Sequence, residues 1–174
     1  MRLGGRAGLA LVAAGLLAAV ATASACGPSA RSVQERFDLS RVQVVIHLER
    51  SEERTTVVAE FRPLEEGLHL YGRDLPMEGI DGAGRPTRVD VADAGWRAVG
   101  PPQPSVDAEN VVLAGFEEPF PIYPDGPVTL RQAIEPTGDL DDGRIELSIT
   151  FMACSSAGVC FAPVERHAMS LPSG

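Results

Sequence analysis

The sequence contains no lysine: all 15 of its basic residues are arginine, and they are outnumbered by 24 acidic residues. The formal net charge of −9 leaves no basic footprint with which to hold a phosphate backbone, so we expect no nucleic-acid partner. Long apolar runs are also missing beyond residue 25, and no later stretch is predicted to span a membrane.

Catalytic motifs with a fixed spacing are missing as well. The chain has no Gly-x-Ser-x-Gly elbow and no glycine-rich loop that would cradle a phosphate. It has no Cys-x-x-Cys pair, which excludes a thioredoxin-type active site. The acidic pairs Glu65-Glu66 and Glu117-Glu118 are typical of solvated turns. We predict no bound cofactor.

The first 25 residues have the features of a secretory signal peptide. Arg2 and Arg6 give a positive start, an apolar run follows, and small residues at positions 23–25 precede Cys26. The sequence therefore predicts export, with cleavage directly before Cys26.

Cys26 is the third cysteine, and an odd cysteine in an exported protein calls for an explanation. Small residues before a cysteine resemble the bacterial lipoprotein signal, in which that cysteine is acylated and becomes the first residue. Acylation of Cys26 would anchor the chain to the cell membrane, facing the periplasm or the cell exterior. Ordinary cleavage after Ala23-Ser24-Ala25 is the alternative. We expect residues 26–39 to form a tether.

Residues 40–174 are predicted to form one all-β domain. About eight short runs alternate apolar and polar residues and are separated by turns rich in Gly, Pro and Asp, which favours a sandwich or barrel. Two long irregular connections, 72–86 and 100–108, interrupt them. The runs cover residues 41–49, 55–61, 67–71, 87–91, 109–116, 128–134, 144–151 and 164–171.

Cys154 and Cys160 end one predicted strand and precede the next, with a small-residue turn at 155–159 between them. Antiparallel pairing of the flanking strands would bring the two side chains within bonding reach, and export favours oxidation. We therefore predict a disulfide. A loop of about seven residues makes it worth only ~2.4 kcal/mol of stability by chain entropy. The residues alone leave a structural and a redox-active bond equally open.

A third alternative is a copper(I) carrier, because sulfur and imidazole ligands suit that ion. The spacing of the possible ligands matches no known metal motif, and we predict no metal site. The candidates are Met152, Cys154, Cys160, His167 and Met169.

The segment FMACSSAGVCFAP, residues 151–163, resembles the N-terminal periplasmic domain of the thiol:disulfide interchange protein DsbD. That family has an aromatic residue before a first cysteine, then five residues, then Cys-aromatic-x-Pro. The segments EEGLHLYGRDL and FPIYPDGPVTL look like two further family segments, so that the resemblance covers most of residues 40–171.

The resemblance implies an immunoglobulin-like β-sandwich with the cysteine pair at one end. It implies that Cys160 exchanges with the partner and that Cys154 is the resolving cysteine. The implied partners are a multi-span membrane electron donor and thioredoxin-like extracytoplasmic oxidoreductases. A cap loop would shield the pair, and two further side chains would line the site. These residues are Phe116, Glu117, Glu118 and Phe120 for the cap, and His69 and Tyr71 for the lining.

The family enzyme also has a multi-span membrane domain and a terminal thioredoxin domain, and this sequence shows neither. We therefore expect a detached, lipid-anchored exchange module whose electron source is another polypeptide, so that activity as an enzyme depends on that partner. The other hypothesis is a binding lipoprotein with no enzymatic role and a structural disulfide.

Overall fold

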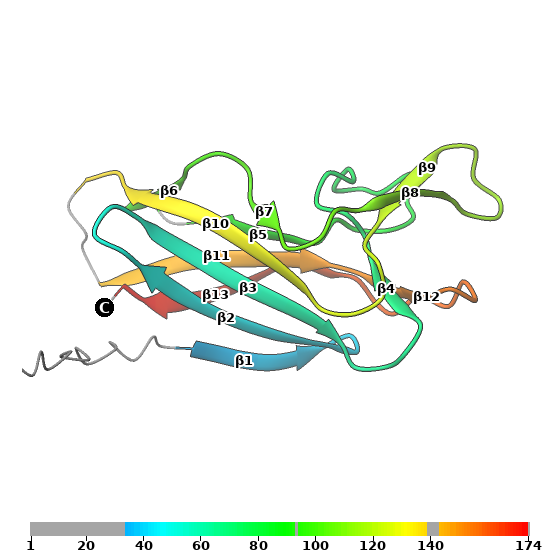
Figure 1. Ribbon diagram of the computed structural model, residues 1–174, viewed down its shortest axis with the longest axis horizontal. Coiled ribbons are helices and arrows are strands. Elements are labelled where there is room, and N and C mark those ends of the chain that lie inside the picture. The colour runs from blue at the N-terminus through cyan, green and yellow to red at the C-terminus, as the bar shows by residue number, and fades with distance from the viewer. Residues whose placement is uncertain (1–33, 93, 139–142, 174) are drawn as a thin grey trace, which may run out of the picture. The chain divides into compact units, whose positions relative to one another are not determined.

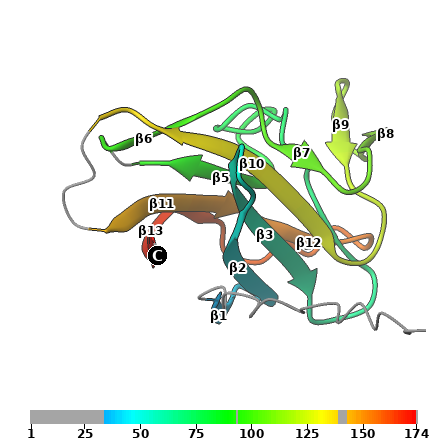
Figure 2. The ribbon, with the colours of Figure 1, turned by 60° about the vertical axis from the view of Figure 1, so that its left-hand side comes forward.

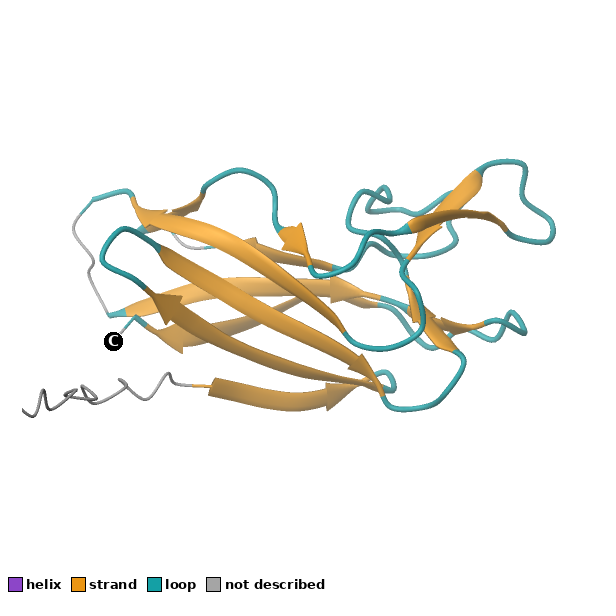
Figure 3. Ribbon diagram, in the orientation of Figure 1, coloured by secondary structure: helices purple, strands orange, loops and turns teal. Residues whose placement is uncertain are grey.

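The computed structural model describes residues 34–92, 94–138 and 143–173. The predicted signal peptide, Cys26 and the tether up to residue 33 lie outside the described residues. Within the described ranges every regular element is a β-strand, and there is no helix long and apolar enough to cross a membrane (Figure 3). The predicted all-β class is confirmed.

Six strands form the larger sheet. They are β1 (Gln34–Leu39), β2 (Val42–Arg50), β3 (Thr55–Pro63), β6 (Trp96–Ala98), β7 (Gln103–Pro104) and β10 (Val128–Pro136). Their order is β1-β2-β3-β10-β6, and β7 also pairs with β10. All of these pairings are antiparallel, and the β2–β3 ladder is continuous from Val42 opposite Pro63 to Arg50 opposite Thr55.

A second sheet of three strands lies against the first (Figures 1 and 2). It has the order β13-β11-β5, from β5 (Arg88–Val91), β11 (Arg144–Phe151) and β13 (Val164–Pro172). Alternate residues of β2 and β11, such as Ile46 and Ile149, are fully buried between the sheets. The result is an immunoglobulin-like sandwich, as predicted.

Four short strands lie together at one end of the sandwich (Figure 1). They are β4 (Leu68–Leu70), which pairs with β12 (Ala153–Ser155), and β8 (Glu109–Val112), which pairs with β9 (Pro119–Ile122). A bridge between Tyr71 and Ile122, and a hydrogen bond from the Tyr123 amide to the Leu70 carbonyl, join the two pairs. This end of the molecule holds the cysteine pair.

Each of the eight predicted runs contains a strand, but five further strands were not predicted: β1, β6, β7, β9 and β12. The predicted tether overlaps β1, because Gln34–Leu39 pairs with β2 along its whole length. This edge strand begins with three exposed residues, and only Phe37 and Leu39 near its end alternate with charged residues and pack against the core. The predicted run 109–116 is shorter in the structure, since β8 ends at Val112.

A substitution at Ile149 tests how much the core between the sheets contributes to stability, because the Ile149 side chain is fully buried. We expect Ile149→Ala to lower the free energy of unfolding by about 2 to 5 kcal/mol, since it removes buried methylene groups and leaves a cavity. Val112→Ala is the matched control, because Val112 is 64% exposed, and a change within about 0.5 kcal/mol is expected. Urea unfolding measures both. Equal losses would contradict the assignment of the core.

Candidate functional site

The cysteine pair lies in a hairpin that connects β12 to the segment before β13. Cys154 and Cys160 are directly opposite each other, with their Cα atoms 4.0 Å apart, and they form a disulfide. Backbone hydrogen bonds of 2.7 and 3.0 Å flank the pair, and this pattern brings facing side chains closest together. The bonds join Ser155 to Val159 and Phe161 to Ala153.

A turn of small residues closes the hairpin. The amide of Gly158 donates to the carbonyl of Ser155 at 2.9 Å, and Gly158 has φ of +82°, a conformation that glycine adopts without strain. The hydroxyl of Ser155 accepts a further bond from the Val159 amide. The sequence therefore folds locally into the geometry that the disulfide needs.

The two cysteines differ in burial. Cys154 is 2% exposed and belongs to an apolar cluster with Tyr71, Leu75, Phe120 and Ile122. Cys160 is exposed on the far side of the turn. An incoming thiol can therefore reach Cys160, while Cys154 is shielded.

Tyr71 contacts the shielded sulfur. Its hydroxyl group donates a hydrogen bond to the Sγ atom of Cys154 at 3.2 Å. Burial raises the pKa of Tyr71 above its ordinary value, so the phenol keeps its proton at neutral and mildly alkaline pH. This hydrogen bond would strengthen if Cys154 became a thiolate, because bonds to charged acceptors are stronger than bonds to neutral ones.

His69 lies directly opposite Cys154 in the β4–β12 ladder. Side chains at facing positions of an antiparallel pair project to the same face, and the His69 ring packs edge-on against Tyr71, with 5.5 Å between centroids. Burial lowers the pKa of the imidazole, and the carboxylate of Asp125 opposes this shift in part. His69 is therefore neutral at pH 7.

A pocket of about 340 Å³ opens beside the disulfide. Its lining includes both cysteines, His69, Tyr71 and Phe116. The lining contains neither Arg nor Lys, so no nearby cation favours a thiolate.

The predicted cap residues lie in the connection between β8 and β9 and in the first half of β9. Phe116 is half-buried and packs edge-on against Phe120, with 4.9 Å between ring centroids, and the fully buried Phe120 contacts the Tyr71 ring in turn. Glu117 and Glu118 are exposed and do not line the pocket. The structure thus brings both aromatic residues to the site and leaves the two acids outside it.

The long connection 72–86 forms a second side of the site. From the sequence this connection was notable only for its length. Leu75 belongs to the apolar cluster that contains Tyr71 and Cys154, and Ile80 and Ala83 pack against this Tyr71 cluster. Gly84 has φ of +77° and lies so close to the Tyr71 ring that a Cβ atom there would be 3.3 Å from it. No motif in the sequence indicated these contacts.

Arg85 fixes the conformation of the connection 72–86 and links it to β13. Its guanidinium group donates to three carbonyl oxygens of its own loop and forms an ion pair of 2.5 Å with Glu165 on β13. The carbonyl groups belong to Glu78, Gly82 and Gly84.

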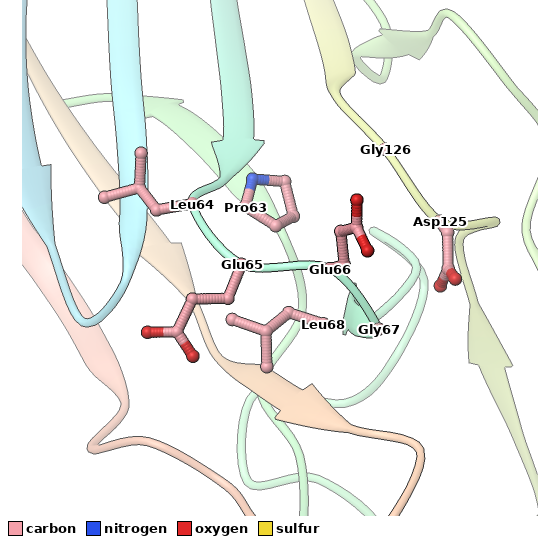
Figure 4. Close-up of a pocket in the computed structure, with 8 residues that line it drawn as sticks. All are labelled: Pro63, Leu64, Glu65, Glu66, Gly67, Leu68, Asp125 and Gly126. Carbon is pink, nitrogen blue, oxygen red and sulfur yellow. The ribbon is translucent and has the colours of Figure 1, made fainter.

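A larger hollow, of about 580 Å³, lies away from the disulfide at the turn between β3 and β4. Figure 4 shows the side chains of Glu65 and Glu66 pointing in different directions there, with Asp125 across the hollow. Glu65 pairs with Arg41 at 3.3 Å. This acidic surface offers no convergent set of groups for chemistry.

The candidate copper(I) ligands are not all gathered at one place. Met152 packs with the Tyr71 cluster, whereas Met169 packs with the core between the sheets. His167 is exposed and its ring lies 5.6 Å from that of Phe37. No group of three or more His, Cys, Asp or Glu residues that could hold a metal ion occurs within the described ranges.

Comparison with solved structures finds similarity to the N-terminal domain of DsbD from Neisseria meningitidis in its reduced form. The identity is 17% and the TM-score 0.43, with 74% of this chain and 82% of that chain covered. No protein-family model matches the sequence, and no curated protein matches it. We therefore argue function from the residues of this chain.

The hydrogen bond from Tyr71 to Cys154 predicts a kinetic effect. We expect Tyr71→Phe to slow reduction of the disulfide by dithiothreitol about tenfold or more, because a hydrogen bond to a charged sulfur is worth about 1.5–3 kcal/mol. To measure the rate of reduction, samples are quenched at intervals, free thiols are alkylated, and the reduced and oxidised proteins are separated and quantified.

Tyr123→Phe is the matched control for this experiment. Tyr123 is equally buried, but its hydroxyl accepts a bond from the Arg73 amide at 3.3 Å and does not contact the disulfide. Its loss should leave the reduction rate within about twofold. If both variants reacted at the parent rate, the Tyr71 hydrogen bond would have no role in exchange.

Proposed function

We propose that this protein is a thiol–disulfide exchange module that passes electrons through Cys154 and Cys160. The observation that carries the proposal is the unequal exposure of the two cysteines: Cys160 is open to a partner, and Cys154 is buried against a hydrogen-bond donor. Exchange needs one reachable sulfur and one leaving sulfur, and this disulfide has both.

The reaction has two steps in each direction. When the disulfide is reduced, a donor thiolate attacks Sγ of Cys160, the Cys154–Cys160 bond breaks, and Cys154 leaves as a thiolate. A second donor thiolate then releases Cys160 and forms the donor disulfide. When the reduced pair gives up its electrons, Cys160 attacks an acceptor disulfide and Cys154 resolves the mixed disulfide.

A purely structural role is less well supported by the position of the bond. The two cysteines are six residues apart, and the flanking hydrogen bonds already close the hairpin. The chain-entropy expression gives ~2.4 kcal/mol for such a loop, near the lower end of what disulfides contribute. A bond placed for stability would gain more by joining distant strands.

The absence of Arg and Lys from the pocket supports exchange inside a docked complex. Because no cation of the lining stabilises a thiolate, the free reduced pair should react slowly with stray oxidants. The partners would be thioredoxin-like extracytoplasmic oxidoreductases as acceptors and a multi-span membrane protein as electron donor. We further propose export and anchoring by lipid at Cys26, which the sequence of residues 1–26 supports.

Trapping the mixed disulfide tests this function. In a Cys26→Ser background, the reduced Cys154→Ala variant should form a covalent complex with a single-cysteine thioredoxin activated as a thionitrobenzoate disulfide. Cys160→Ala should form almost none, because the remaining thiol is buried. Non-reducing electrophoresis measures the yields. Equal yields, or none from either variant, would count against the proposal.

The equilibrium with glutathione separates a redox pair from a structural bond. We expect the parent disulfide to be reduced with a midpoint above about −300 mV, the value below which structural disulfides usually lie. Alkylation of thiols after equilibration in a glutathione series reports the reduced fraction. A bond that stayed oxidised throughout the series would favour the binding lipoprotein with a structural disulfide.

A further inference from the structure

The neighbour that faces Cys154 on β4 is a histidine with an unused nitrogen. His69 is 8% exposed, and its Nε2 atom is buried without a hydrogen-bond partner among the described residues. The imidazole and both cysteines line the same pocket. Facing positions of an antiparallel ladder place the Cβ atoms about 4.5–5.5 Å apart, so the imidazole of His69 is within reach of the Cys154 sulfur.

We propose that His69 is the base that takes the proton from the Cys154 thiol when the reduced pair gives up its electrons. This inference rests on the proposed exchange function and deepens it, because it assigns the proton transfer of the resolving step. That step needs a base inside the pocket, since Cys154 is shielded from water.

The resolving step is a proton transfer followed by a thiol–disulfide exchange. Cys160 is first joined to an acceptor protein through a mixed disulfide. The Cys154 Sγ–H proton moves to a ring nitrogen of His69, and the resulting thiolate attacks Sγ of Cys160. The Cys154–Cys160 bond forms, the bond from Cys160 to the acceptor breaks, and the acceptor sulfur leaves with the electron pair. The imidazolium then releases its proton to solvent or to the leaving sulfur.

No other side chain lining the described pocket can do this near neutral pH. Its titratable members are His69, Tyr71 and the two cysteines. Tyr71 keeps its proton, because burial raises its pKa, and it acts as a hydrogen-bond donor to Cys154. The other residues that line the pocket are apolar or carry hydroxyl groups.

The surroundings of His69 suit both of its charge states. Tyr71 packs against the imidazole from two residues further along the chain, and Cys154 faces it from β12. Burial lowers the pKa of His69 and keeps the imidazole neutral and ready to accept a proton. Asp125 lowers the energy of the imidazolium once it forms. Glu109 and Tyr123 line a second pocket that His69 also borders, so these are the further titratable groups on that side of the imidazole.

The test follows the two thiols of the reduced full-length chain in a Cys26→Ser background. Excess dithiobis(nitrobenzoate) reacts first with Cys160, and Cys154 then closes the internal disulfide, so that each step releases one coloured thionitrobenzoate. The second phase isolates the resolving step. It should be nearly independent of pH from about 6.5 to 8 in the parent, because proton transfer within the neutral imidazole–thiol pair leaves the total protonation unchanged.

In His69→Gln the second phase should slow about 100-fold at pH 6.5, the size of effect typical of general-base catalysis. It should then rise about tenfold per pH unit as the free thiol ionises. The first phase should not change, because Cys160 is exposed and needs no internal base.

Two further variants keep the test decisive. His69→Tyr retains a ring against Tyr71 but supplies no base, and it should show the same pH dependence as His69→Gln if the glutamine variant folds poorly. His167→Gln is the matched control, because His167 is exposed on β13, and it should follow the parent.

The results distinguish the role of His69 from the exchange function itself. Parent and His69 variants with the same pH profile for the second phase would overturn the role of His69 and leave the exchange function standing. No second phase in the parent, together with no thioredoxin complex, would overturn both.

Discussion

The pairing of β12 with β4 is the constraint on which the site depends. These two short strands place Cys154 opposite His69 and on the same face as Tyr71, where it is almost completely buried. The turn that follows projects away from this pair, so Cys160 remains exposed. One disulfide therefore joins a buried and an exposed cysteine, and this difference supports the exchange that we propose, in which the partner meets Cys160 and Cys154 leaves or resolves.

The core of the sandwich supports this arrangement. Along β4 and β12 the side chains alternate, so that Leu70 and Ala153 pack into the core between the sheets while their neighbours face the disulfide pocket. The same strands thus belong to both the core and the site. A site supported by a packed core can hold its hydrogen-bond geometry while exposed loops around it move.

Much of the framework could be predicted from residue patterns. Strands with one face toward the core, such as β2 and β11, are predicted by the alternation of apolar and polar residues. Edge and end strands are harder to predict: β1 begins with three exposed polar residues, and in β9 the apolar residues Phe120 and Ile122 alternate with prolines, which argue against a strand. The cysteine hairpin was predictable because its turn is local. The wall built from residues 72–86 was not, since its contacts are set by packing with Tyr71.

The sequence by itself determined that two cysteines would face each other, because strand-forming segments and a small-residue turn lie within a few residues of them. It also placed the site within the chain through the cysteine spacing. Only the tertiary structure decided which sulfur is shielded and which groups touch it. Tyr71 and Cys154 are 83 residues apart in the chain, and no local pattern specifies that a distant strand will bring a phenol and an imidazole to a particular sulfur.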